Sequence, residues 1–171
     1  VIRYGIQVNS TGTGSTGFKI TGNYIGGSQA NAGGTAMTYA GNVNQSYQGI
    51  YIATLAAGKN LVSGNYIRNI SLNHGGAQNI LLFVGINDVN GDNKITGNYI
   101  GGLAAADAIT INSNWTTTAS TAHGIYCAAG VDTVTNNTIS RISLSNTAGI
   151  VGFNGIYMAT TAAPNLIIDN N

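Results

Sequence analysis

The nine residues KITGNYIGG occur twice in this chain, at 19–27 and again at 94–102. The two copies are 94 − 19 = 75 residues apart, and the same offset carries the tripeptide at 49–51, Gly-Ile-Tyr, onto the one at 124–126. Self-similarity at a fixed period is the sequence signature of repeat architectures. The chain is therefore predicted to form a single segment of repeat units at 1–75 and 76–150, with a partial unit at 151–171.

Two short motifs alternate along the chain. The first motif is Gly-Ile-x-apolar, with copies that begin at Gly5, Gly49, Gly124 and Gly155 and a degenerate copy at Asn79-Ile80-Leu81-Leu82. The second motif is apolar-x-Gly-Asn-x-Ile, with copies at 20–25, 62–67, 95–100 and 134–139, the last carrying Asn136 in place of the glycine. Each motif has the length of one strand, and residues two apart on a strand face the same side. We expect the closing isoleucines of the second motif to point inward: Ile25, Ile67, Ile100 and Ile139.

The spacing of the first motif predicts how the strands are arranged. Successive copies are separated by 49 − 5 = 44, 79 − 49 = 30, 124 − 79 = 45 and 155 − 124 = 31 residues. The short step suits one coil of a solenoid, and the long step suits a coil that carries an insertion, at 26–48 and at 101–123. Stacking such coils at about 4.8 Å per layer pairs each strand with its equivalent above and below. The predicted fold is all-β, a single-stranded parallel β-helix of about 4–5 coils in two-coil repeats.

A column of asparagines is expected at the corner that precedes each inward isoleucine. The members are Asn23, Asn65, Asn98 and Asn137. Stacked at equivalent places, their side-chain amides can hydrogen-bond from coil to coil as a ladder. An antiparallel sandwich of hairpins is the main alternative fold, because many short strands with glycine-rich turns also suit it. The sandwich does not explain identical motifs at a fixed offset.

The composition excludes several classes of partner. Charged residues make up 6% of the chain and the formal net charge is +1, so the basic stripe that nucleic-acid binding requires is not expected. No run of about 18 apolar residues predicts a membrane-spanning helix. Cys127 has no second cysteine with which to form an internal disulfide. Both ends of the chain read as interior repeat sequence, so we expect the chain to be a piece of a longer protein.

The motifs ITGNYIGG, GIYIA and NNTISRIS resemble the parallel β-helix repeat regions of very large surface proteins that Bacteroidota export by the type IX secretion route. The resemblance covers essentially the whole chain. It implies a right-handed β-helix that serves outside the cell, at the cell surface, as a structural stalk or adhesin segment. The implied partners are adjacent coils and domains of the same polypeptide, together with surface glycans or other cells.

Catalysis is the alternative that the β-helix architecture raises, since some parallel β-helices are polysaccharide lyases or glycoside hydrolases. Such enzymes need carboxylates on neighbouring coils, and lyases also use bound Ca²⁺. In the alignment of the two motifs, no two aspartates occupy equivalent positions of the repeat, and none falls in the core of a repeated strand. His74 and His123 precede different motifs, which argues against a site built on a histidine pair. The sequence therefore predicts a non-enzymatic segment without a cofactor.

Three weaker candidate sites remain. Asp88, Asn90 and Asp92 alternate as in the first half of a Ca²⁺ loop, but the glycine falls at 91 and no Glu follows, so a polar turn is the favoured interpretation. Outward tyrosines form the second candidate. They either bind glycans by stacking on sugar rings, or they only pack against one another and stiffen the sheet. The first column is Tyr51, Tyr126 and Tyr157, and the second is Tyr24, Tyr66 and Tyr99, with Thr138 interrupting it. Trp115, in the second predicted insertion, is a further candidate for ligand binding.

Overall fold

The computed structural model describes residues 1–10, 12, 16–41, 45–54, 59–75, 81–114, 120–146, 149, 151–159, 167–169 and 171. Within these ranges the regular structure is β-strand, apart from two short 3₁₀ turns, η1 (Ala30–Ala32) and η2 (Ala105–Asp107). None of the helical turns in these ranges has the length and apolar character needed to span a membrane.

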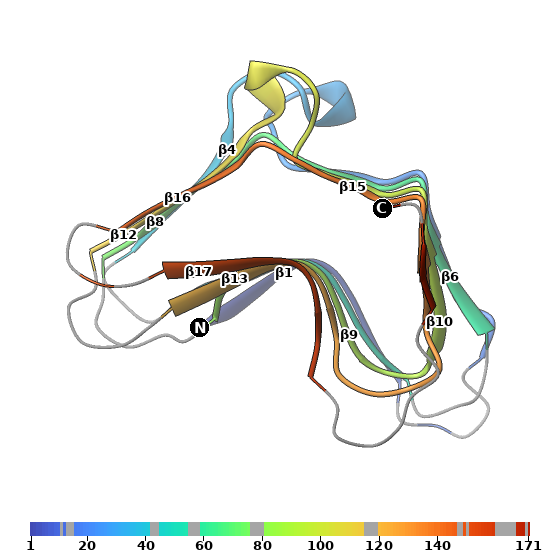
Figure 1. Ribbon diagram of the computed structural model, residues 1–171. Coiled ribbons are helices and arrows are strands. Elements are labelled where there is room, and N and C mark those ends of the chain that lie inside the picture. Colours follow the sequence, from blue (N-terminus) through green and yellow to red (C-terminus); the bar gives the residue numbers. More distant parts are fainter. Residues whose placement is uncertain are drawn as a thin grey trace.

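The strands form four sheets, and the chain visits the sheets in the same order each time (Figure 1). The first sheet contains, in spatial order, β1 (Ile2–Ser10), β5 (Ser46–Thr54), β9 (Leu81–Asn90), β13 (Ser120–Cys127) and β17 (Val151–Met158). The second contains β2 (Lys19–Thr21), β6 (Lys59–Ser63), β10 (Asp92–Thr96), β14 (Thr133–Thr135) and β18 (Ile167–Asp169). The third contains β3 (Tyr24–Ile25), β7 (Tyr66–Ile67), β11 (Tyr99–Ile100) and β15 (Thr138–Ile139), and the fourth contains β4 (Met37–Gly41), β8 (Ile70–His74), β12 (Ile109–Ser113) and β16 (Ile142–Asn146).

All of the strand pairs in the four sheets are parallel. An antiparallel sandwich, the alternative fold, is therefore wrong, and the prediction of an all-β chain with parallel sheets is confirmed. We call one passage through the four sheets a circuit. Figure 1 shows successive circuits lying one behind another along the line of sight, an arrangement compatible with a β-solenoid.

Equivalent residues of the second motif lie side by side in the sheets, as their identity predicts. The register aligns Ile20, Val62, Ile95 and Val134 across the second sheet, and Ile25, Ile67, Ile100 and Ile139 across the third. In the middle circuits these side chains are fully buried, with 0% exposure for Ile67, Ile95 and Ile100. The core is thus a set of aliphatic columns, each built from one position of the motif.

The register of β9 corrects one sequence prediction. Ile86 pairs with Ile50 on one side and with Ile125 on the other, so the third copy of the first motif is Gly85-Ile86-Asn87-Asp88. The degenerate copy at Asn79-Ile80-Leu81-Leu82 is wrong, and its first two residues lie outside the described ranges. The steps around the true copy are 85 − 49 = 36 and 124 − 85 = 39 residues. The true copy is hidden in the sequence because an aspartate stands where the other copies have an apolar residue.

Close approach between circuits explains the glycine of the first motif. A Cβ on Gly49 would lie 2.6 Å from the carbonyl oxygen of Gly85, and a Cβ on Gly85 would lie 2.5 Å from that of Gly124. Real Cβ atoms do not approach backbone oxygens so closely, and at each position an isoleucine side chain occupies the remaining space at 2.8 Å. Only glycine lets neighbouring backbones meet in this way.

The asparagine ladder predicted at the corner between the second and third sheets is confirmed. In each step a side-chain Nδ2 donates to the Oδ1 of the next asparagine at 2.9 Å, along Asn23, Asn65, Asn98, Asn137 and finally Asn171. The backbone N–H of each donor residue also donates to that same Oδ1, at 2.9–3.1 Å. Asn171 is a fifth member that the motif comparison did not identify.

Both predicted insertions are only partly correct. The ranges 26–48 and 101–123 include β4 and β12, which pair with β8 in the fourth sheet and carry apolar residues at alternate positions. The excursions from the sheets are shorter, at 26–36 and 101–108, and they contain η1 and η2 (top of Figure 1). An ion pair of 3.1 Å between Arg68 and Asp107 anchors the second excursion to the neighbouring circuit.

Candidate functional sites

The first tyrosine column is interrupted. The register across the first sheet places Asn87 between Tyr51 and Tyr126, and only Tyr126 and Tyr157 are neighbours, with ring centroids 5.5 Å apart. Tyr51 instead contacts Tyr4, at 5.0 Å. The prediction that these tyrosines bind a ligand stays a prediction, but the structure does not bring the three together as one platform.

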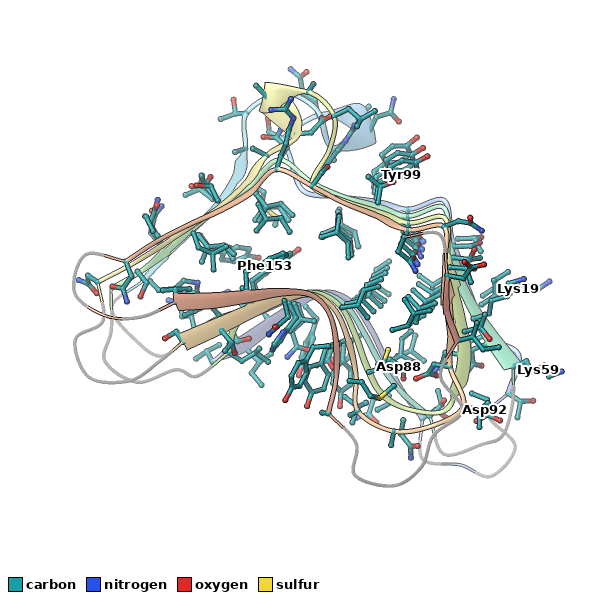
Figure 2. The ribbon with its side chains drawn as sticks, viewed as in Figure 1. Lys19, Lys59, Asp88, Asp92, Tyr99 and Phe153 are labelled. Carbon is teal, nitrogen blue, oxygen red and sulfur yellow. The ribbon has the colours of Figure 1, made fainter. Side chains whose placement is uncertain are left out.

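The second tyrosine column is continuous through β3, β7 and β11, and Thr138 takes the place of tyrosine on β15, as the motif predicts. Tyr24, Tyr66 and Tyr99 stack with centroid separations of 4.8 and 4.7 Å and interplanar angles of 7° and 3°. Figure 2 shows the labelled Tyr99 in a row of rings on the outer side of the third sheet. The guanidinium of Arg68 lies over the Tyr66 ring, 5.4 Å from its centroid. The ring faces are thus covered by one another, which favours a role in stiffening the sheet over stacking on sugars.

The two histidines lie in different sheets. His123 on β13 packs against the Tyr157 ring at 4.9 Å, and its Nδ1 is 3.2 Å from Nδ2 of Asn154. His74 is buried on β8 in the fourth sheet. Burial lowers the pKa of both imidazoles, so both are held in the neutral form at neutral pH.

The three residues of the candidate Ca²⁺ loop have separate partners. Asp88 points into the core and accepts a hydrogen bond from Asn93 Nδ2 at 2.7 Å. Asn90 Oδ1 accepts from the backbone N–H of Gly91 at 3.0 Å, whereas Asp92 Oδ1 accepts from that of Val131 at 3.1 Å. Asp88 and Asn90 belong to β9 and Asp92 to β10, with only Gly91 between the strands, so the interpretation of 87–93 as a polar turn is wrong for the buried Asp88. Trp115, the remaining candidate, lies outside the described residues.

A buried cluster that the sequence analysis missed lies between the first and second sheets. Three donor atoms lie within 4.8 Å of one another: one carboxylate oxygen of Asp88, one carboxylate oxygen of Asp132 and the sulfur of Cys127. All three residues have 0% exposure. Asp88 occupies the inward position of the first motif in β9, beside Cys127 in β13, so the prediction that no aspartate lies in a repeated strand core is wrong.

A second polar ladder positions Asp132. Asn60 Nδ2 donates to Asn93 Oδ1 at 2.9 Å, and the backbone N–H of Asn93 donates to Asp132 Oδ1 at 3.1 Å. Asp132 thus takes the place that asparagine holds in the two preceding circuits. The signal was present in the sequence, since asparagine or aspartate precedes the second motif by two residues in each of these copies, at 60, 93 and 132.

Burial dominates the electrostatics of this cluster. Burial, and then the neighbouring Asp132 carboxylate, raise the pKa of Asp88 to about 9. Burial also raises the pKa of Asp132 and that of the Cys127 thiol, the latter far above its ordinary range. In the absence of a cation, Asp88 therefore keeps its proton at neutral pH and can donate it to Asp132.

The carboxylate pair does not have the geometry of a glycosidase. The carboxyl pairs of retaining and inverting glycosidases flank a sugar at separations of about 5–9.5 Å. Here both carboxyl groups face the interior with 0% exposure, where a polysaccharide cannot reach them. The cluster therefore does not favour the enzymatic alternative.

Comparison of the chain with known protein families, with curated proteins and with solved structures finds no match.

Proposed function

We propose that this chain is a segment of a right-handed, single-stranded parallel β-helix that acts as a non-catalytic stalk or display surface outside the cell. The observation that carries the proposal is the in-register stacking of equivalent residues through every circuit. A structure of this kind gains length by adding circuits, because each circuit contacts only its neighbours. Length and stiffness are then properties of the sequence repeat itself.

The side-chain arrangement supports a mechanical role. The internal columns are held by aliphatic packing, the corner between the second and third sheets is held by the asparagine ladder, and tyrosines stack on the outer side of β3, β7 and β11. These features recur from circuit to circuit, whereas a catalytic or binding site is a local departure from the repeat. The cluster that departs most from the repeat, around Asp88, is closed to large substrates.

Location and partners rest on the resemblance to type IX-exported surface proteins of Bacteroidota. In that setting the partners are neighbouring circuits and domains of the same polypeptide, with glycans or other cells contacting the outer surface. Charge supports neither nucleic acid nor an acidic lipid surface as a partner, because the formal net charge is only +1.

Small-angle X-ray scattering on chains that carry one, two or four tandem copies of the two-circuit unit 19–93 tests the proposal, because residue 94 begins the same motif as residue 19. Each circuit should add about 4.8 Å of length, so each added unit should contribute roughly 10 Å at constant cross-section. A matched chain with Ile67→Asp in every copy should lose this regular extension. A maximum dimension that grows as expected for a compact globule, or a cross-section that widens with copy number, would contradict the proposal.

A further inference from the structure

We propose that Asp88, Cys127 and Asp132 form a buried binding site for one divalent transition-metal ion, with Zn²⁺ as the best-suited probe. The inference is independent of the stalk function, since it concerns the interior of the fold. Figure 2 shows the labelled Asp88 on the inner side of the ribbon.

The backbone brings the three ligands together from two successive circuits. Asp88 lies on β9, and its register partner Cys127 lies on β13, the next strand of the first sheet. Asp132 immediately precedes β14 in the second sheet. The donor atoms lie within 4.8 Å of one another. Donors at about 2.0–2.3 Å from a tetrahedral ion are about 3.5 Å apart, so a small inward movement of the side chains completes the geometry.

Asn93 orients both carboxylates toward the cluster. Its Nδ2 donates to Asp88 Oδ2 at 2.7 Å, and its backbone N–H donates to Asp132 Oδ1 at 3.1 Å. Hydrogen bonds of this kind hold metal-ligating carboxylates in position in known metal sites. They use one oxygen of each carboxylate and leave the other oxygen available.

The remaining carboxylate oxygens are placed to bind a cation. Asp88 Oδ1 and Asp132 Oδ2 are both buried and have no hydrogen-bond donor from outside the cluster. An unpaired buried carboxylate is costly, and buried charges in proteins are paired or coordinate metals. The ion pair that the described residues contain joins Arg68 to Asp107, so neither carboxylate is compensated by a basic side chain. A divalent ion would satisfy both oxygens at once.

The donor set selects the metal. Ca²⁺ and Mg²⁺ prefer oxygen ligands, whereas Zn²⁺ accepts both cysteine sulfur and carboxylate oxygen. Three protein ligands leave a fourth position for a water molecule. Because the ligands come from neighbouring circuits and from two sheets, the ion would cross-link the stack at this corner.

Metal content and a cobalt spectrum test the proposal on the unaltered protein. Protein refolded with Zn²⁺ and then desalted should retain about one Zn²⁺ ion per chain, as measured by elemental mass spectrometry. The same sample should unfold at a higher temperature than protein refolded with EDTA. Co²⁺ in place of Zn²⁺ should give a thiolate-to-cobalt charge-transfer band. Since Cys127 is the sole cysteine, this band would place the metal at the cluster without any substitution.

Substitutions provide the matched controls. Asp88→Asn, Asp132→Asn and Cys127→Ser should each weaken Zn²⁺ binding at least tenfold, and Asp107→Asn, which changes an aspartate paired with Arg68 outside the cluster, should leave it unchanged. Retention of the metal by all three cluster variants, or a Co²⁺ complex without the thiolate band, would overturn the proposal. So would a wild-type protein that retains no Zn²⁺ and has the same melting temperature with Zn²⁺ and with EDTA, in which case the carboxyl groups share a proton instead.

Discussion

Truncation of one asparagine in the middle of the ladder should destabilise the protein strongly. Asn98 and Asn65 both have 0% exposure. The Asn98→Ala variant removes the acceptor of the Asn65 backbone N–H (3.1 Å) and of one N–H of Asn65 Nδ2 (2.9 Å), so two buried N–H groups lose their partner while the other Nδ2 hydrogen bond, to Ile20 O, remains. Each buried unsatisfied group costs about 1–3 kcal/mol, which gives an expected loss of about 4 kcal/mol in the free energy of unfolding.

Asn23→Ala is the matched control, because Asn23 occupies the same place in the outermost circuit. Its side chain donates to Asn65 Oδ1 at 2.9 Å, but the backbone N–H of residue 23 still donates to that oxygen at 3.0 Å after truncation. The expected loss is below about 1 kcal/mol. Urea unfolding followed by far-UV circular dichroism measures both values. Losses that agree within about 0.5 kcal/mol would refute the reasoning, since position in the stack would then not matter.

Three further predictions concern the backbone approach, the buried acid and the core. Gly85→Ala should lower the free energy of unfolding by about 1–3 kcal/mol, because its Cβ would lie 2.5 Å from a carbonyl oxygen of the next circuit. Gly155→Ala is the control: a Cβ there has no atom within 4 Å, so the free energy of unfolding should change by less than about 0.5 kcal/mol. Equal effects of the two substitutions would contradict the register. In EDTA, stability should fall as pH rises between about 4 and about 9, because folding raises the pKa of Asp88 to about 9 and also raises that of Asp132, so the native state holds more protons than the unfolded state. Each retained proton contributes at most about 1.4 kcal/mol per pH unit. Asp88→Asn should reduce this slope, and an unchanged slope would count against the assignment. Ile67→Asp should cost at least about 4 kcal/mol in thermal or urea unfolding, and Tyr66→Asp, on the outward side, clearly less; similar losses would mean that the inward direction is wrong.

The parts of the fold that sequence reasoning predicted correctly are those in which one residue recurs at one place. The isoleucines of the second motif and the asparagines before them must occupy equivalent positions if the circuits stack, and the register confirms both. The glycine of the first motif was recognised as recurrent, but the reason for it, contact with the next backbone, depends on a distance that no sequence pattern contains.

Sequence reasoning failed where the repeat is broken. Asp88 occupies a position that is apolar in the other copies of the first motif, so the motif comparison places the third copy at 79–82 instead of 85–88. The predicted spacing of the circuits is wrong for the same reason. With that register, Asp88 and Asp132 could not be recognised as neighbours. The motifs do not predict the fourth sheet for a related reason. Its alternating apolar residues, such as Met37 and Tyr39 in β4 and Ile109 and Ile111 in β12, lie in ranges that contain neither motif.

Scalar couplings across hydrogen bonds, measured by NMR, test the parallel stacking most directly. The amide nitrogen of Tyr99 should couple to the carbonyl carbon of Asn65, and that of Gly101 to the carbonyl carbon of Ile67, because each N–H donates to that carbonyl at 2.8 Å. Residues thirty-odd positions apart would then be joined in the same direction along both strands. Couplings from Tyr99 and Gly101 to carbonyls in reversed order, as in an antiparallel pair, would contradict the account.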